Sequence, residues 1–136
     1  MNRELFQELA RLRLKEAQAD AGCPDGAYYL AGYAVECALK ACICRNINQY
    51  DFPPKPEVVR DVYSHKLPNL LKIAGLDVKL KGDAPQGSAL DGNWAIVSLW
   101  SEESRYRIAA EQEARDLCAA IAHPQEGVLT WLQQNW

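Results

Sequence analysis

Arg60 and His65 are the two residues whose types and spacing best fit catalytic chemistry. Histidine can take or give a proton near neutral pH, and arginine can hold a phosphate through two hydrogen bonds. Together they could cleave RNA by attack of its own 2′-hydroxyl group without a metal ion, because this reaction needs proton transfer and stabilisation of a charged phosphate. The alternative is that His65 caps and packs a turn before a helix. We favour this structural role, since an arginine and a histidine at this spacing are often found together by chance.

A second set of residues could bind a nucleotide. Its members are polar or aromatic: Tyr29, Tyr33, Glu36, Lys40, Arg105 and Tyr106. The first four recur at the spacing that places them on one face of a helix, where Glu36 and Lys40 can pair at i,i+4. If that face meets Arg105, Glu36 could hold Arg105 in an ion pair that fixes helix register, which is the interpretation we favour. The functional alternative is a cleft in which the cations and tyrosines contact a phosphate and a base.

The sequence predicts neither a metal site nor a bound cofactor. Its five cysteines contain no C-x-x-C pair, and it has only two histidines. We therefore interpret the cysteines as small reduced core residues. The four tryptophans lie at helical spacing with other apolar residues, which favours core or subunit-interface positions over base-stacking positions. No phosphate-binding glycine loop, hydrolase elbow, zinc-protease helix or paired-carboxylate motif is present.

Length and composition favour one globular domain, residues 1–136. The chain has 49% hydrophobic residues and a formal net charge of −3. A chain of this length can bury a core without disulfides, and its charge gives no support to general nucleic-acid binding. The charged N-terminus lacks the apolar segment of a signal peptide, and no apolar run reaches membrane-spanning length. We therefore expect a cytoplasmic protein that does not associate with membranes.

Residues 27–44 are the stretch around which the remaining elements should pack. They are apolar and small on most sides, with alanines on one face, which predicts a buried helix ending near Arg45 or Asn46.

We expect a first helix over residues 2–21 and later helices over 67–74, 93–103, 108–122 and 128–136. Residues 48–56 should form a proline-rich linker, residues 57–63 could form a short helical turn, and residues 77–87 should form a mobile polar loop. Ser88 is a candidate N-cap. Five or six helices without a convincing strand predict an all-α, up-and-down bundle.

Several of these blocks resemble a known family. The segment AYYLAGYAVECALKA, beginning at Ala27, is similar to the signature helix of the HEPN domains. The similarity continues in the family's order at Ser64-His65-Lys66-Leu67, at Leu70-Leu71, at Ala74-Gly75-Leu76 and at Trp94, Trp100 and Ser104-Arg105-Tyr106. It covers most of the chain, and the first block is the most specific.

This resemblance implies a helical bundle that is often a homodimer and often works beside a small nucleotidyltransferase. The leading prediction is therefore a nucleotide- or RNA-interacting module with such a partner, as in toxin–antitoxin pairs. Ribonuclease members carry an arginine and a histidine four to six residues apart, which Arg60 and His65 match. The first alternative is accordingly a metal-independent endoribonuclease toxin. The second is a structural dimerisation bundle without a ligand.

Overall fold

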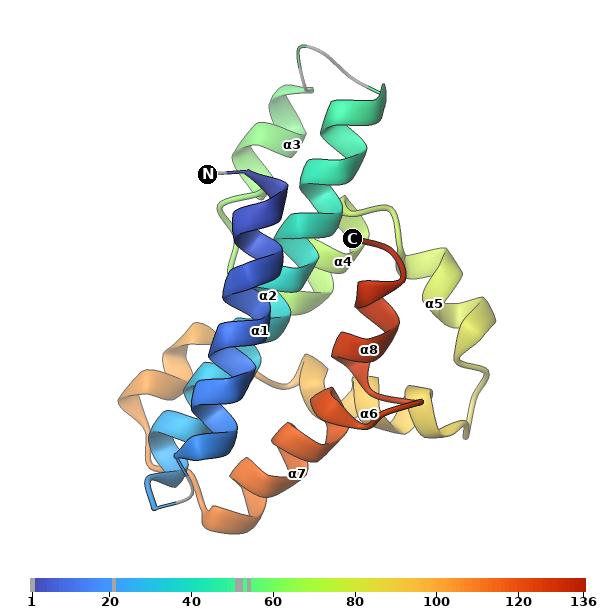
Figure 1. Cartoon of the computed structure of the whole chain (residues 1–136). Coiled ribbons are helices and arrows are strands. Elements are labelled where there is room, and N and C mark those ends of the chain that lie inside the picture. Colours follow the sequence, from blue (N-terminus) through green and yellow to red (C-terminus); the bar gives the residue numbers. More distant parts are fainter. Residues whose placement is uncertain (1, 21, 51–52, 54) are drawn as a thin grey trace.

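Most of the other helices pack against α2 (Pro24–Tyr50), the longest helix of the protein (Figure 1). The computed structural model describes residues 2–20, 22–50, 53 and 55–136. Because proline disfavours helix only at its own position and the one before it, the prolines that begin at Pro53 do not prevent residues 47–50 from continuing α2. The prediction that this helix ends near Arg45 was therefore wrong, and part of the predicted linker lies outside the described residues.

α1 (Arg3–Ala19) packs along α2, and the two helices run antiparallel (Figure 1). Four alanines of α2 have no exposed surface: Ala31, Ala34, Ala38 and Ala41. Ala10 and Ala17 of α1 are equally buried. Side chains this small let two helix backbones approach closely, so the predicted role of the alanine face is consistent with the packing.

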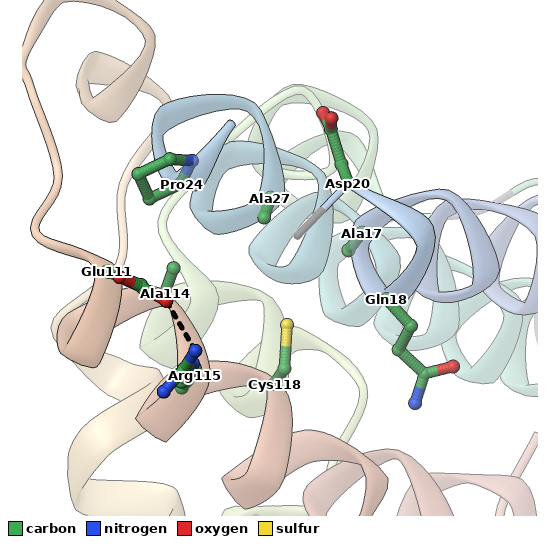
Figure 2. A pocket seen from close by; sticks show the side chains of 9 residues that line it. All are labelled: Ala17, Gln18, Asp20, Pro24, Ala27, Glu111, Ala114, Arg115 and Cys118. Carbon is green, nitrogen blue, oxygen red and sulfur yellow. Dashed lines mark hydrogen bonds and ion pairs between the residues drawn. The ribbon is translucent and has the colours of Figure 1, made fainter. Parts of the chain in front are cut away.

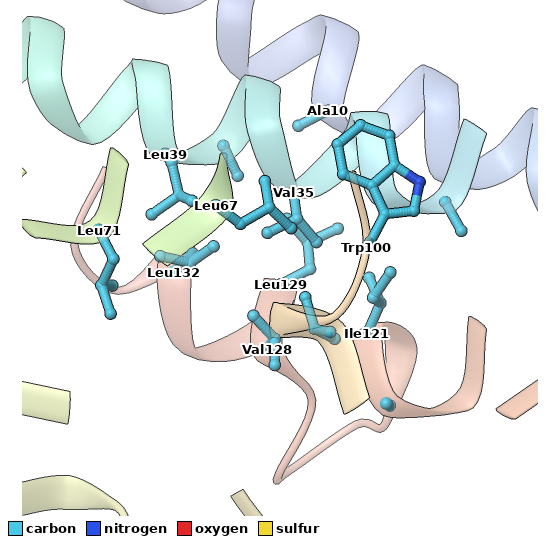
Figure 3. Close-up of a cluster of buried hydrophobic side chains, with 14 of the residues drawn as sticks. Ala10, Val35, Leu39, Leu67, Leu71, Trp100, Ile121, Val128, Leu129 and Leu132 are labelled. Atoms are coloured by element: carbon cyan, nitrogen blue, oxygen red, sulfur yellow. The ribbon is translucent and has the colours of Figure 1, made fainter. Parts of the chain in front are cut away.

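The larger apolar residues of α2 pack against helices from the second half of the chain. These are α4 (Leu67–Ile73), α7 (Glu111–Ala122) and α8 (Val128–Gln133), with α6 (Ala89–Ser98) behind them. Figure 3 shows Val35 and Leu39 of α2 among Leu67, Ile121 and Leu132. One hydrophobic core thus gathers side chains from α1 to α8, which confirms the predicted all-α bundle. Ser88 caps α6 as predicted, accepting the Asp91 N–H at 3.2 Å.

Two short helices raise the number of α-helices above the five or six predicted, to eight in the described part of the chain. One is α3 (Pro56–Asp61), and the other is α5 (Asp77–Asp83), which replaces the predicted mobile loop. Leu76, Leu80 and Ala84 are buried at four-residue intervals, so α5 has an apolar side that its lysines, aspartates and glycine obscure in the sequence. Two contacts with the C-terminal region also hold it: the Trp131 indole N–H donates to Asp83, and Lys79 donates to Asn135.

Trp100 lies directly on the backbone of α2. It is 2% exposed, and a Cβ atom added at Gly32 would overlap its indole ring. The helix predicted over residues 93–103 therefore ends at Ser98, since the chain must leave α6 to insert Trp100. A 3₁₀ helix, η1 (Glu102–Tyr106), follows immediately and contacts α2. None of the described helices is long and apolar enough to cross a membrane.

Replacing Gly32 with alanine should destabilise the protein by about 3 kcal/mol, because the buried indole ring cannot move aside without disturbing the core. Gly92→Ala in α6 is the matched control: a Cβ there meets nothing within 4 Å, so alanine should stabilise the helix by about 0.5–1 kcal/mol. Chemical denaturation of both variants measures the difference. Equal stability of the Gly32→Ala variant and the wild type would contradict the close approach of Trp100.

Candidate functional site

The six residues predicted to bind a ligand lie along one surface, where η1 crosses α2. Tyr29, Tyr33, Glu36 and Lys40 follow one face of α2, and Arg105 of η1 lies beside Tyr29 and Tyr106. We call this surface the α2–η1 strip. It has an aromatic end, nearer the start of α2, and an ionic end one to two turns further along the helix.

The aromatic end consists of neighbouring, mutually tilted rings with an arginine at their exposed edge. The centre of the Tyr29 ring lies 6.0 Å from the centre of the Tyr33 ring and 6.1 Å from that of the Trp100 ring. Arg105 is exposed, and its guanidinium carbon lies 4.9 Å from the centre of the Tyr106 ring. The phenol groups of Tyr106 and Tyr29 raise the pKa of Arg105 above its usual value, so this cation stays charged at any physiological pH. This end of the strip therefore offers a permanent positive charge beside aromatic faces.

The ionic end is built around the buried carboxylate of Glu36. Its Oε1 atom accepts from Lys40 Nζ at 3.0 Å and lies 2.9 Å from Nδ1 of His65. The other ring nitrogen of His65, Nε2, lies 3.3 Å from a carboxylate oxygen of Glu102. His65 thus connects α2 to η1 through two carboxylates.

The structure differs from the favoured sequence interpretation at this point. Glu36 pairs with Lys40 and His65 rather than with Arg105, because the Arg105 side chain turns to the two tyrosines. The part played by Glu102 was not predicted. No local pattern marks it, since its contact with His65 depends on where Trp100 anchors the chain that precedes η1.

Three buried polar atoms at this crossing have no hydrogen-bond partner among the described residues. They are Oε2 of Glu36, Nε1 of Trp100 and Oγ of Ser104. Leaving a buried polar group unpaired costs about 1–3 kcal/mol. Unpaired polar groups of this kind are more common at functional sites than elsewhere, which makes the crossing a candidate site.

Arg60 is engaged separately from His65. It lies exposed on α3, and its Nε atom donates to Asp61 at 2.9 Å. It lines a cleft of about 710 Å³ between α3 and α4, together with Tyr63, Ser64 and Lys72, and His65 is not part of that lining. Within one chain, each of the two candidate catalytic residues thus has its own acidic partner and its own surroundings.

A separate apolar hollow of about 230 Å³ lies between α1, α2 and α7 (Figure 2). Ala17, Ala27 and Ala114 line it, and an ion pair between Glu111 and Arg115 lies at its edge. Burial raises the pKa of the Cys118 thiol, so this thiol is neutral at physiological pH. The lining offers contact to a small apolar group but no arrangement of catalytic side chains.

The buried cysteines behave as core residues. Burial raises the pKa of Cys37 to about 11 and that of Cys42 to about 12, so both remain neutral thiols and poor metal ligands. Over the ranges that the structure describes, no three histidine, cysteine, aspartate or glutamate side chains are grouped so that they could hold a metal ion.

No protein-family model, curated protein or solved structure is significantly similar to this chain. The relation to HEPN domains therefore stays a prediction from the residues quoted above.

Replacing His65 with alanine should lower the free energy of unfolding by about 1–3 kcal/mol, because it removes the hydrogen bond to the buried Glu36 and the contact with Glu102. Arg60→Ala is the control: its pair with Asp61 is exposed, and such pairs contribute little. Thermal unfolding should therefore separate the two variants. An unchanged melting temperature for His65→Ala would contradict the view that His65 stabilises the protein by connecting α2 to η1.

Proposed function

We propose that this chain is a HEPN-like module that binds a nucleotide or RNA at the α2–η1 strip. In this proposal it acts in the cytoplasm beside a nucleotidyltransferase partner, in a toxin–antitoxin pair or a related nucleotide-handling complex. The observation that supports it most directly is the position of Arg105, an exposed cation in contact with Tyr29 and Tyr106. A guanidinium group can hold a phosphate through two hydrogen bonds, and an adjacent aromatic ring can stack on a base.

The charges around the strip are compatible with an anionic ligand. The carboxylates of Glu36 and Glu102 face Lys40 and His65, so neither stands alone beside Arg105. Arg105 itself makes no ion pair with any described carboxylate, which leaves its guanidinium group available to a phosphate.

The two protein partners in this proposal have different support. The nucleotidyltransferase comes from the HEPN resemblance alone, and a nucleotidyltransferase reading frame beside this one would be direct support for it. A homodimer is also expected from the resemblance. Ile108, between η1 and α7, is 87% exposed and lies outside the α2–η1 strip, so it is suited to such an interface.

The endoribonuclease alternative finds less support. Both ring nitrogens of His65 face carboxylates, and Arg60 lines a cleft without it. If the protein were nevertheless such an enzyme, cleavage would persist in a chelator and leave a 2′,3′-cyclic phosphate, and His65→Ala and Arg60→Ala would each abolish it. The structural-bundle alternative predicts that no nucleotide or RNA binds.

Arg105→Ala should weaken binding of a fluorescent adenosine nucleotide or a labelled short uridylate by about tenfold or more, because it removes a charge-assisted contact to phosphate. Arg115→Ala is the matched control, since Arg115 is equally exposed but lies on α7 and pairs with Glu111. Fluorescence anisotropy measures both. Equal affinities of the two variants, with clear binding by the wild type, would place the ligand elsewhere; no binding by the wild type would overturn the proposal.

Sedimentation at micromolar concentration should give twice the chain mass if the protein is a homodimer. Changing Ile108 to serine should shift the protein towards monomer, because this side chain is already exposed and its loss costs the isolated fold little. The exposed Val78 on α5 provides the control substitution. A wild-type protein that sediments as a monomer would remove the dimer from the proposal.

A further inference from the structure

Three clefts on the surface of the protein are neighbours, because consecutive clefts share lining residues. The first is the cleft between α3 and α4 that Arg60 lines. Asn69 belongs to this cleft and to a second of about 240 Å³ that Lys66 and Trp100 also line. Leu99 and Ser101 belong to the second cleft and to a third, of about 490 Å³, that reaches Tyr106. We call this row of three clefts, from Arg60 to Tyr106, the long groove; Tyr106 also belongs to the α2–η1 strip.

The half of the long groove nearer α3 is positively charged. Lys66 and Lys72 are exposed and make no ion pair with a described residue. Arg60 uses its Nε atom to bind Asp61, which orients the guanidinium group and leaves its two terminal nitrogens without a described partner. Three cations thus face one acid, in a protein whose formal net charge is −3. This local excess is what a phosphate backbone requires.

The other half of the groove carries a different balance of charge. Arg107 is held by Glu113 at 2.7 Å and lies over the Tyr28 ring, so it is less available to a ligand. Glu103 lines this half and has no described cationic partner. Arg105, beside Tyr106, is the cation that can compensate it.

An exposed aromatic ring lies in each end cleft of the groove. Tyr63, 76% exposed, lines the first cleft, and Tyr106, 79% exposed, lines the third. Of the phenylalanine, tyrosine and tryptophan side chains that the structure describes, these two are exposed and the others are partly or fully buried. Leu99, which lines the clefts between them, is 81% exposed. Aromatic rings beside cations are the combination that binds unpaired bases, whereas the bases of a duplex have no free faces to stack.

We infer that the long groove binds a single-stranded nucleic acid several nucleotides long. Its phosphates pass Lys72, Arg60 and Lys66, and its bases stack on Tyr63 at one end and on Tyr106 at the other. This inference rests on the proposed function and makes it more specific: the ligand is an extended strand, because a mononucleotide fills only one of the three clefts. Glu103 opposes the strand and weakens its binding.

Labelled uridylates of one to about sixteen nucleotides test the inference, since this range covers the usual site sizes for single strands. Affinity measured by fluorescence anisotropy should rise with length and then level off. Lys72→Ala should weaken the long oligomers and leave the mononucleotide unaffected. It should also reduce the slope of log affinity against log salt by about 0.7, the contribution of one phosphate contact on a single strand. Lys81→Ala, at an exposed lysine of α5 outside the groove, should change neither quantity.

The aromatic and acidic residues give independent tests with the same oligomers. Tyr63→Ala should weaken the long oligomers about tenfold, and Tyr63→Phe should retain their affinity, because stacking needs the ring and not the hydroxyl group. Glu103→Gln should strengthen binding, since it removes the opposing charge. Tyr63, Lys72 and Glu103 are all exposed, and circular dichroism confirms that the variants remain folded.

The outcomes separate this inference from the function on which it rests. Binding of the mononucleotide as tight as that of the longest oligomer, with no effect of Lys72→Ala or Tyr63→Ala, would overturn the groove and leave the α2–η1 strip as the site. A clear preference for duplex over single strand would also overturn it. Failure to bind any nucleotide or oligomer would overturn both proposals.

Discussion

The contact between Trp100 and the backbone of α2 at Gly32 determines how the second half of the chain is placed. Only a residue without a Cβ atom leaves room for the indole ring there. The ring fills the core from the far side of α2, and the chain on either side of it is therefore fixed: α6 must end before it and η1 must begin after it. Glu102, Arg105 and Tyr106, which follow Trp100 closely in the chain, are placed relative to this contact.

Polar groups at the crossing of α2 and η1 depend on the same contact. With Trp100 seated, Glu102 reaches His65, His65 reaches Glu36, and Arg105 reaches Tyr29. The buried carboxylate of Glu36 is stabilised by Lys40 and His65, yet its second oxygen is unpaired. A leucine at this position would suit a core built for stability alone. The carboxylate of Glu36 instead orients Lys40 and His65 at the α2–η1 strip, which fits the binding role proposed for that surface.

The sequence predicts the bundle well wherever one helix face is continuously apolar. The alanines of α2 and the apolar stripe of α7 can be recognised as buried from the sequence, because the buried residues recur there at helical spacing. In α5, Leu80 is isolated among charged residues in the sequence, and the helix is held by burial of its apolar side and by contacts with Trp131 and Asn135, about fifty residues away. The site shows the same division: the tyrosines, Glu36 and Lys40 share a face by spacing alone, whereas the pairing of His65 with Glu102 is a tertiary contact that no local pattern encodes.

The way in which α5 is attached has a consequence for the dynamics of the protein. Little apolar surface joins this helix to the bundle, and two hydrogen bonds to α8 and the residues after it supply much of the remaining attachment. Such a segment can open as a unit while the bundle stays folded, so its amide hydrogens should exchange with solvent before those of α2 and α7. In Figure 1 it stands at the opposite edge of the bundle from the segment that joins α6 to α7, which includes η1. Local opening or a lengthened chain at α5 would therefore leave the α2–η1 crossing in place.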